Sequence, residues 1–226
     1  MTVPVLTIDG PGGAGKGTVC ARLALEFEWH LLDSGAIYRL LGLKARREGV
    51  DLVDEESVTS LARELAIQFT PTSGEDLVRA WLDGEDVSRA IRTEYAGRDA
   101  SLVAAIGPAR QALLDRQRAF RAPPGLIADG RDMGTVVFVD APLKIFLTAS
   151  ADERARRRHK QLIDKGVGAS LADLSAEIEE RDRRDRERQV APLRPAQDAV
   201  FIDTTGVPVD EVIRQVRLLA ESRQLV

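Results

Sequence analysis

A glycine-rich segment near the amino terminus constrains the fold of this chain more than any other part of its sequence. The segment fits the pattern G-x-x-x-x-G-K and consists of Gly10, Pro11, Gly12, Gly13, Ala14, Gly15, Lys16, Gly17 and Thr18. A short β-branched run at residues 3–8 precedes it, and apolar residues at helical spacing follow it. Glycines here let consecutive backbone N–H groups face one anion, and the next helix adds its positive N-terminal end. The segment predicts a phosphate-binding loop in which Lys16 contacts the outer phosphates of a nucleotide.

Magnesium is the cation expected beside such a loop, but the sequence departs from the usual pattern. Ser or Thr normally follows the lysine directly, whereas Gly17 stands there and Thr18 comes one residue later. Ligation by the Thr18 hydroxyl and a magnesium ion held mostly by water and nucleotide phosphates therefore both stay open. Asp33 and Asp129, each at the end of an apolar run, are further candidates for binding magnesium, directly or through water, or for capping a helix or loop.

Strand and helix patterns alternate along most of the chain. We expect strands at residues 3–8, 30–32, 126–129, 144–148 and 200–203, and helices at residues 102–120, 151–164 and 207–222. Ser34 is expected to be the N-cap of a helix that carries Ile37 and Leu40. Residues 66–88 contain short strand patterns and the hairpin pair Asp83-Gly84. The sequence predicts an α/β fold of the P-loop NTPase type, a parallel sheet flanked by helices, with a small inserted α+β lobe.

Composition limits the partners of this protein. Its 226 residues include 32 Lys and Arg against 36 Asp and Glu, so the net charge of -4 leaves no basic footprint for nucleic acid. One cysteine and two histidines exclude a disulfide scaffold and an all-protein zinc site. No stretch approaches the roughly 18 apolar residues of a membrane span. We expect a cytoplasmic protein that binds neither nucleic acid nor membrane and, with no long apolar seam, a monomer.

Arginines form three groups, and phosphoryl transfer needs such fixed cations to neutralise spreading negative charge. Arg39 and Arg131 stand singly after two of the expected strands. The other two groups each share one helical face, and their members are Arg154, Arg157 and Arg158, then Arg181, Arg184, Asp185 and Arg188. A solvated helix face explains any single arginine, since six acids balance six bases between residues 177 and 194. A phosphate loop, however, implies a polyanion over which the set as a whole can close.

Four segments together resemble the nucleoside monophosphate kinases, and among them the bacterial type of cytidylate kinase. They are residues 10–18, 32–39, 127–138 and 181–186. The resemblance implies one kinase domain with a core at about residues 1–59 and 106–226. It also implies a monophosphate-binding lobe at about residues 60–105 and a helical lid at about residues 151–168. The implied reaction moves the γ-phosphoryl group of ATP to CMP or dCMP, with Mg²⁺, and gives ADP and the nucleoside diphosphate.

The same resemblance implies roles for single residues. The phosphate loop with Arg154 and Arg158 would bind ATP, and the catalytic groups would be Lys16, Arg131, Arg157 and Arg188. Asp132 would read the cytosine edge, because a carboxylate accepts a hydrogen bond from an amino group and rejects the uracil carbonyl. The remaining acceptor contacts would be Ser101 and Arg110 on the ring, Ser34, Arg39, Arg131 and Arg188 on the phosphate, Arg181 and Asp185 on the sugar, and Tyr38 stacked or packed nearby.

Two other functions stay open at this point. A P-loop kinase for UMP or for a shikimate-like acid would also use an arginine-rich acceptor site. Asp132, Ser101 and Arg110 would have no evident role toward an acid that lacks a ring amide. A nucleotide-dependent switch that binds a partner or single-stranded RNA is the non-enzyme alternative, but 4% aromatic residues are few for a stacking platform.

Overall fold

The computed structural model describes residues 3–74, 76–164, 166–188 and 190–226. Residue 75 of the expected lobe and residue 165 of the expected lid thus lie outside the described residues. Five parallel strands form the main sheet in the order β2-β6-β1-β7-β8. Their bounds are Val5–Asp9 (β1), His30–Asp33 (β2), Leu126–Gly130 (β6), Leu143–Thr148 (β7) and Val200–Asp203 (β8). The predicted parallel sheet is confirmed, and its central strand, β1, leads directly into the phosphate loop.

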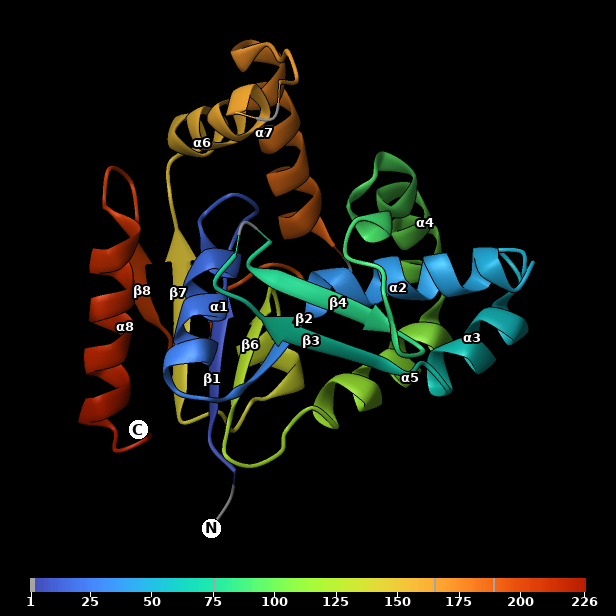
Figure 1. Cartoon of the computed structure of the whole chain (residues 1–226), viewed down its shortest axis with the longest axis horizontal. Helices are drawn as coiled ribbons and strands as arrows, with labels where there is room; N and C mark the ends of the chain where they lie inside the picture. The colour runs from blue at the N-terminus through green and yellow to red at the C-terminus, as the bar shows by residue number, and fades with distance from the viewer. Residues whose placement is uncertain (1–2, 75, 165, 189) are drawn as a thin grey trace.

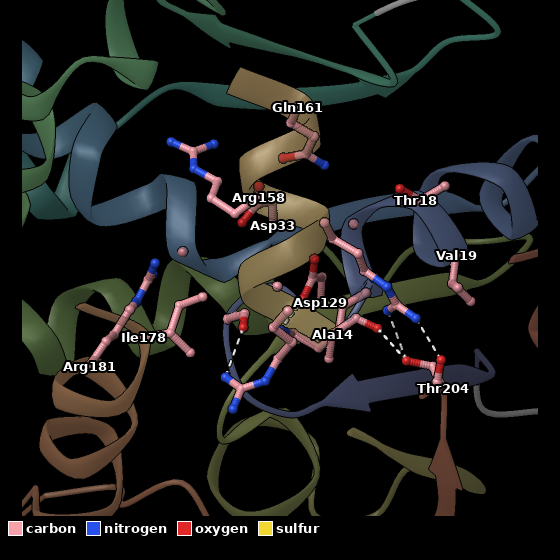
Figure 2. Close-up of a pocket in the computed structure, with 18 of the residues that line it drawn as sticks. Ala14, Thr18, Val19, Asp33, Asp129, Arg158, Gln161, Ile178, Arg181 and Thr204 are labelled. Carbon is pink, nitrogen blue, oxygen red and sulfur yellow. Dashed lines mark hydrogen bonds and ion pairs between the residues drawn. The ribbon is translucent and has the colours of Figure 1, made fainter. Parts of the chain in front are cut away.

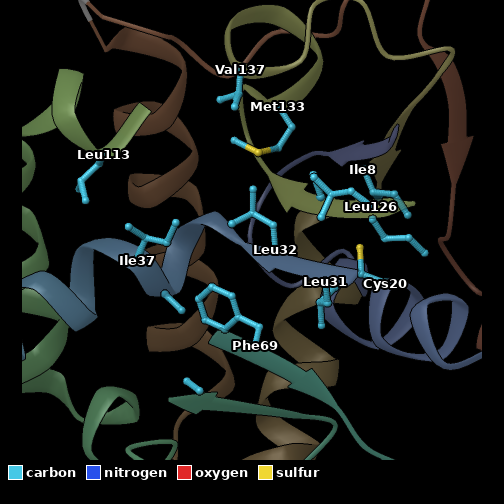
Figure 3. Packing of buried hydrophobic residues seen from close by; sticks show 14 of the residues in the cluster. Ile8, Cys20, Leu31, Leu32, Ile37, Phe69, Leu113, Leu126, Met133 and Val137 are labelled. Atoms are coloured by element: carbon cyan, nitrogen blue, oxygen red, sulfur yellow. The ribbon is translucent and has the colours of Figure 1, made fainter. Parts of the chain in front are cut away.

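Helices flank this sheet (Figure 1). Helix α1 (Lys16–Glu26) packs on β1 and β6, while α8 (Val209–Ser222) packs on β7 and on α1. Helix α2 (Ser34–Arg47) contacts β6 and continues away from the sheet toward the smaller lobe. Buried side chains of β1, β2 and β6 meet those of α1, α2 and α5, as Ile8, Leu32, Leu126, Cys20, Ile37 and Leu113 show (Figure 3).

A three-stranded antiparallel sheet lies beside the main one. It contains β3 (Ile67–Pro71), β4 (Val78–Leu82) and β5 (Glu85–Asp86), and it is accompanied by α3 (Glu55–Arg63), a 3-10 turn (Ala90–Arg92), α4 (Glu94–Ala104) and α5 (Gly107–Arg118). The hairpin expected at Asp83-Gly84 is confirmed, because both residues have positive φ, 50° and 83°. Positive φ at both central residues matches the right-handed twist of the flanking strands.

Two local expectations are wrong. The single helix expected at residues 102–120 is two helices, α4 and α5, separated at Ile106, whose backbone is extended. Pro108 stands in the first turn of α5, where its missing N–H costs nothing, and it cannot continue a preceding helix. The N-cap of α2 is Asp33 rather than Ser34, because the Asp33 backbone is extended and its carboxylate accepts from the Ala36 amide at 3.0 Å.

Two more helices stand above the carboxyl ends of the main strands (Figure 1). Helix α6 (Ala151–Asp164) follows β7, and α7 (Leu171–Glu187) packs against α6. The carboxyl edge of a parallel sheet is where ligands bind in such folds, so these helices cover the expected site. Within the described part of the chain, no helix is long and apolar enough to cross a bilayer.

Gly10 is the position where the fold depends most directly on the absence of a side chain. Its φ is +150°, and an added Cβ would lie 1.9 Å from the Leu147 carbonyl oxygen of the neighbouring strand β7. We expect Gly10→Ala to lower the free energy of unfolding by about 3 kcal/mol, because backbone must move to admit the methyl group. Gly49→Ala is the matched control, since φ is +70° there and nothing lies within 4 Å. Its expected loss in urea unfolding is about 1 kcal/mol, and equal losses for the two variants would contradict this account.

Candidate active site

A cavity of 1570 Å³ opens at the carboxyl ends of the main strands. The phosphate loop forms its floor, the ends of β2 and β6 contribute Asp33, Asp129 and Arg131, and α6 and α7 form its far wall. Figure 2 shows Arg158 of α6 and Arg181 of α7 together with Asp33 and Asp129 around this space. The cavity is therefore built by segments from both halves of the sequence.

Lys16 is buried at the base of the cavity. Gly15 is left-handed, with φ 93°, and brings the chain from the loop into the first turn of α1, where Lys16 stands. The Lys16 ammonium donates to the Pro11 carbonyl at 2.9 Å and lies 3.9 Å from a carboxylate oxygen of Asp129. Burial lowers the pKa of Lys16, and the nearby Asp129 carboxylate opposes that effect. A phosphate group bound in the loop would add negative charge next to this ammonium and would stabilise its charged form.

The three predicted magnesium residues line the same cavity. Asp33 uses one carboxylate oxygen to cap α2, and Asp129 faces Lys16. Burial raises the pKa of Asp129, and the neighbouring Asp33 carboxylate adds to this effect, while Lys16 opposes it. Among the described residues, no group of three or more His, Cys, Asp or Glu side chains could hold a metal alone. Two carboxylates and the Thr18 hydroxyl suit magnesium, which keeps several waters and shares its ligands with nucleotide phosphates.

Two of the three predicted arginines of α6 are engaged within the protein. Arg154 is buried and forms a bidentate pair with Asp182 of α7, at 2.9 and 2.6 Å, and also donates to the Gly12 and Ala149 carbonyls. Arg157 donates to the hydroxyl and the carbonyl of Thr204, at 3.0 and 2.5 Å. In this conformation Arg154 connects α6 to the phosphate loop, and Arg157 fastens α6 beside the end of β8.

Three more of the predicted arginines line the same cavity as Arg131, Arg154 and Arg157. They are Arg39, whose guanidinium also donates to the Ile91 carbonyl at 2.8 Å, and Arg158 and Arg181. Arg181 lies over the loop, since a Cβ added to Gly12 would be 3.3 Å from its Nη1. Burial by surrounding protein and the charge of Arg131 lower the pKa of Arg181. Burial and the charges of Arg131 and Arg158 likewise lower the pKa of Arg39. Mutually repelling cations around one space favour a polyanion as the ligand.

Asp185 joins two of the predicted phosphate-clamp arginines. It is buried on α7, and its two carboxylate oxygens accept from Arg131 and from Arg188, the latter at 2.5 Å. Both partners hold its oxygens in this structure, so its predicted contact with the sugar stays a prediction. Its observed effect is to hold two guanidinium groups side by side.

A second group of predicted residues gathers beside Arg188. The guanidinium of Arg110 lies 5.7 Å from the centre of the Tyr38 ring, and burial raises the pKa of the Tyr38 hydroxyl. Burial also raises the pKa of Asp132, while Arg110 and Arg188 oppose that rise. Ser34 is buried close to Gly130 at the start of the same segment. The Ser101 hydroxyl donates to the Gly97 carbonyl of its own helix, at 3.1 Å, and its predicted contact with the ring stays a prediction.

Sequence reasoning missed three residues that support the site. Asp182 pairs with Arg154, Thr204 donates toward the Ala14 carbonyl of the phosphate loop at 3.2 Å, and Asp9 accepts two backbone hydrogen bonds behind the loop. The position of Asp9, directly before the first loop glycine, is the one signal that could have marked it. Asp182 sits in a run of alternating charges, where nothing distinguishes the buried acid from the exposed ones.

Comparison with known proteins decides the family. The sequence pattern of the cytidylate kinase family matches residues 6–222. This chain belongs to the cytidylate kinase family. A cytidylate kinase from Pseudomonas putida strain W619 is 56% identical over 223 residues, which cover 99% of this chain and 98% of that protein. A cytidylate kinase from Stutzerimonas stutzeri strain A1501 is 57% identical over 219 residues, or 97% and 95% of the two chains.

The predicted membership of the family of bacterial cytidylate kinases is thereby confirmed. Among solved structures, an uncharacterized protein from Eubacterium ventriosum aligns with 97% of this chain and 98% of its own length, at a TM-score of 0.55. The two sequences are 11% identical, so that likeness concerns the fold alone.

The contrast between Arg154 and Arg158 predicts different consequences of losing each of these lid arginines. Arg154→Met leaves Asp182 buried without its partner, and we expect the free energy of unfolding to fall by about 3 to 5 kcal/mol. Arg158→Met removes an exposed side chain, so we expect stability to change by less than about 0.5 kcal/mol and kcat to fall about 100-fold. Urea unfolding and a coupled assay of ADP formation separate the two, and an unstable Arg158 variant with full activity would reverse the assignment.

Proposed function

We propose that this protein transfers the γ-phosphoryl group of ATP to CMP or dCMP, and that Asp132 selects the base. The observation that carries the choice of base is the placement of Asp132 next to Arg110 and Arg188, one residue after Arg131 of the phosphate-clamp pair. A carboxylate accepts a hydrogen bond from the cytosine amino group, and the charges of Arg110 and Arg188 oppose the rise that burial causes in the pKa of Asp132. Full-length relatives named cytidylate kinase support the same reaction.

The reaction needs no general base, because the attacking group is a phosphate oxygen that is ionised at neutral pH. Catalysis comes from holding two anions in line and neutralising the charge that spreads over the transferred group. The Lys16 ammonium would contact the outer phosphates of ATP, with backbone N–H groups of the loop around them. Arg131 and Arg188, fixed side by side through Asp185, would grip the acceptor phosphate together with Arg39 and Ser34. Arg158 and Arg181 would close over the phosphates and exclude water.

Magnesium, when bound, neutralises phosphate charge and orients the transferred group. Thr18 and Asp129 are the residues that would hold it, directly or through water, with the second carboxylate oxygen of Asp33 nearby. We further propose that the protein works in the cytoplasm as a monomer on small molecules, in line with its balanced charge.

The alternative acceptors are disfavoured. UMP would present a carbonyl to Asp132, so that two acceptors would face each other in a largely dry site. A shikimate-like acid would leave Asp132 and Arg110 without a ring to read. A nucleotide-dependent switch is disfavoured by membership of a kinase family that covers residues 6–222.

Asp132→Asn tests the base assignment. An amide can donate to the uracil carbonyl or accept from the cytosine amino group, so we expect the ratio of kcat/KM for CMP to that for UMP to fall about 10- to 100-fold. The measurement is the coupled assay of ADP formation over a panel of nucleoside monophosphates. Asp140→Asn is the matched control, because this exposed carboxylate pairs with Arg121, and the proposal gives neither residue a contact with a nucleotide. An Asp132 variant that keeps the full preference for cytosine would refute the assignment.

The pH dependence of magnesium use follows from the pKa of Asp129, which burial raises to about 7. Above that pH the carboxylate is ionised and can bind the ion or its waters, while below it the protonated form cannot. We expect the Mg²⁺ concentration that gives half-maximal rate to rise as the pH falls from 8 to about 6. Asp129→Asn should need more Mg²⁺ at every pH and lose this part of the dependence. If the unmodified enzyme and the Asp129→Asn variant showed the same pH dependence, the dependence would come from the nucleotide phosphates instead.

A further inference from the structure

The side chain of Asp9 connects the two halves of the active site. Asp9 ends the central strand β1 and directly precedes Gly10 of the phosphate loop. Its carboxylate is buried and accepts from the backbone amides of Met133, at 2.9 Å, and Gly134, at 2.8 Å. These amides directly follow Arg131 and Asp132, so one carboxylate joins the start of the loop to the segment with the proposed acceptor contacts.

The two amides need an acceptor that their own segment cannot provide. Met133–Val137 is a short π-helical turn, and the first N–H groups of any helical turn lack partners within it. Both residues are buried, and a buried N–H without a partner is costly. An ionised carboxylate, which only accepts, satisfies both at once, whereas an amide offers one oxygen. Burial raises the pKa of Asp9 to about 6, even though the two hydrogen bonds act in the opposite direction. The ionised form therefore prevails at neutral pH.

The rest of the segment fits tightly around this anchor. A Cβ added to Gly130 would lie 2.6 Å from Cγ of Met133 and 2.8 Å from the hydroxyl of Ser34. The Met133 side chain is fully buried. The segment is therefore fixed before Arg131 by packing and after Asp132 by the Asp9 carboxylate, and these two side chains project from between the fixed points.

We propose that Asp9 is a positioning residue for acceptor recognition, which sets the place of Asp132 relative to the phosphate loop through its two hydrogen bonds to Met133 and Gly134. Asp9 touches neither substrate in this scheme. The inference rests on the proposed function, because it assigns Asp132 to the acceptor base.

Asp9→Asn is the direct test, since it keeps the shape of the side chain but turns an NH2 group toward one of the two amides. Loss of one charge-assisted hydrogen bond lets the segment shift, so we expect KM for CMP to rise about tenfold and the preference for CMP over UMP to fall by a similar factor. KM for ATP should stay within about twofold, because the backbone of the phosphate loop itself is unchanged.

Val216→Ala is the control for a loss of stability alone. Val216 is buried on α8, outside the cavity lining, and its truncation lowers stability without touching the acceptor segment. It should leave the ratio of CMP to UMP activity unchanged. An Asp9 variant with an unchanged ratio, or with KM for ATP raised as much as KM for CMP, would overturn the proposal.

The unmodified protein provides a second readout that does not depend on the variant's folding. In NMR spectra, the amide protons of Met133 and Gly134 should shift together as acid protonates Asp9. Independent or absent shifts would show that the carboxylate does not hold them and would also overturn the proposal. Failure of the proposed function can be told apart from failure of this proposal. In that case the unmodified enzyme would not phosphorylate CMP, whether or not the two amide signals shift.

Discussion

Buried carboxylates on α7 hold together a set of arginines that would otherwise repel one another. Asp182 fixes Arg154 of α6, and Asp185 fixes Arg131 and Arg188. A buried guanidinium without such a partner would cost several kcal/mol. The same two acids therefore permit a dense positive site in a protein whose net charge is -4. Because α7 carries both acids, the position of α6 and the positions of Arg131 and Arg188 are linked through one helix.

The sheet sets the distance between the phosphate loop and the segment that carries Arg131 and Asp132. β1 lies between β6 and β7, so the phosphate loop leaves the sheet next to the strand that ends in Asp129 and Gly130. Gly10 packs against the backbone of Leu147, and Gly130 packs against the side chains of Met133 and Ser34, so neither position admits a side chain without displacement. The site is thus preorganised where the chain is rigid, on strand ends, while the lid arginines come from helices that stand outside the sheet.

The sequence predicts the strands of the main sheet better than it predicts helix boundaries. Glycine and lysine spacing determines the phosphate loop locally, and apolar runs that end in Asp33 and Asp129 are typical of parallel strands. The prediction of one helix at residues 102–120 was wrong because the apolar periodicity continues across Ile106, whereas the extended backbone before Pro108 interrupts the helix. The burial of Arg154 and Asp182 could not be predicted either. Both lie in charge-rich helices in which the buried charged residues and the exposed ones show the same sequence pattern. Tertiary contacts decide which of several equivalent charges is buried.

The central claim is that one continuous site binds the phosphates of ATP and of a cytidine monophosphate together. Calorimetric titration with a ligand that joins adenosine and cytidine through a chain of five phosphates tests it most directly. The account predicts one ligand bound per chain, displaced both by ATP and by CMP, and an affinity well above that of either alone. Displacement by only one of the two nucleotides, or simultaneous binding of CMP and the joined ligand, would contradict it.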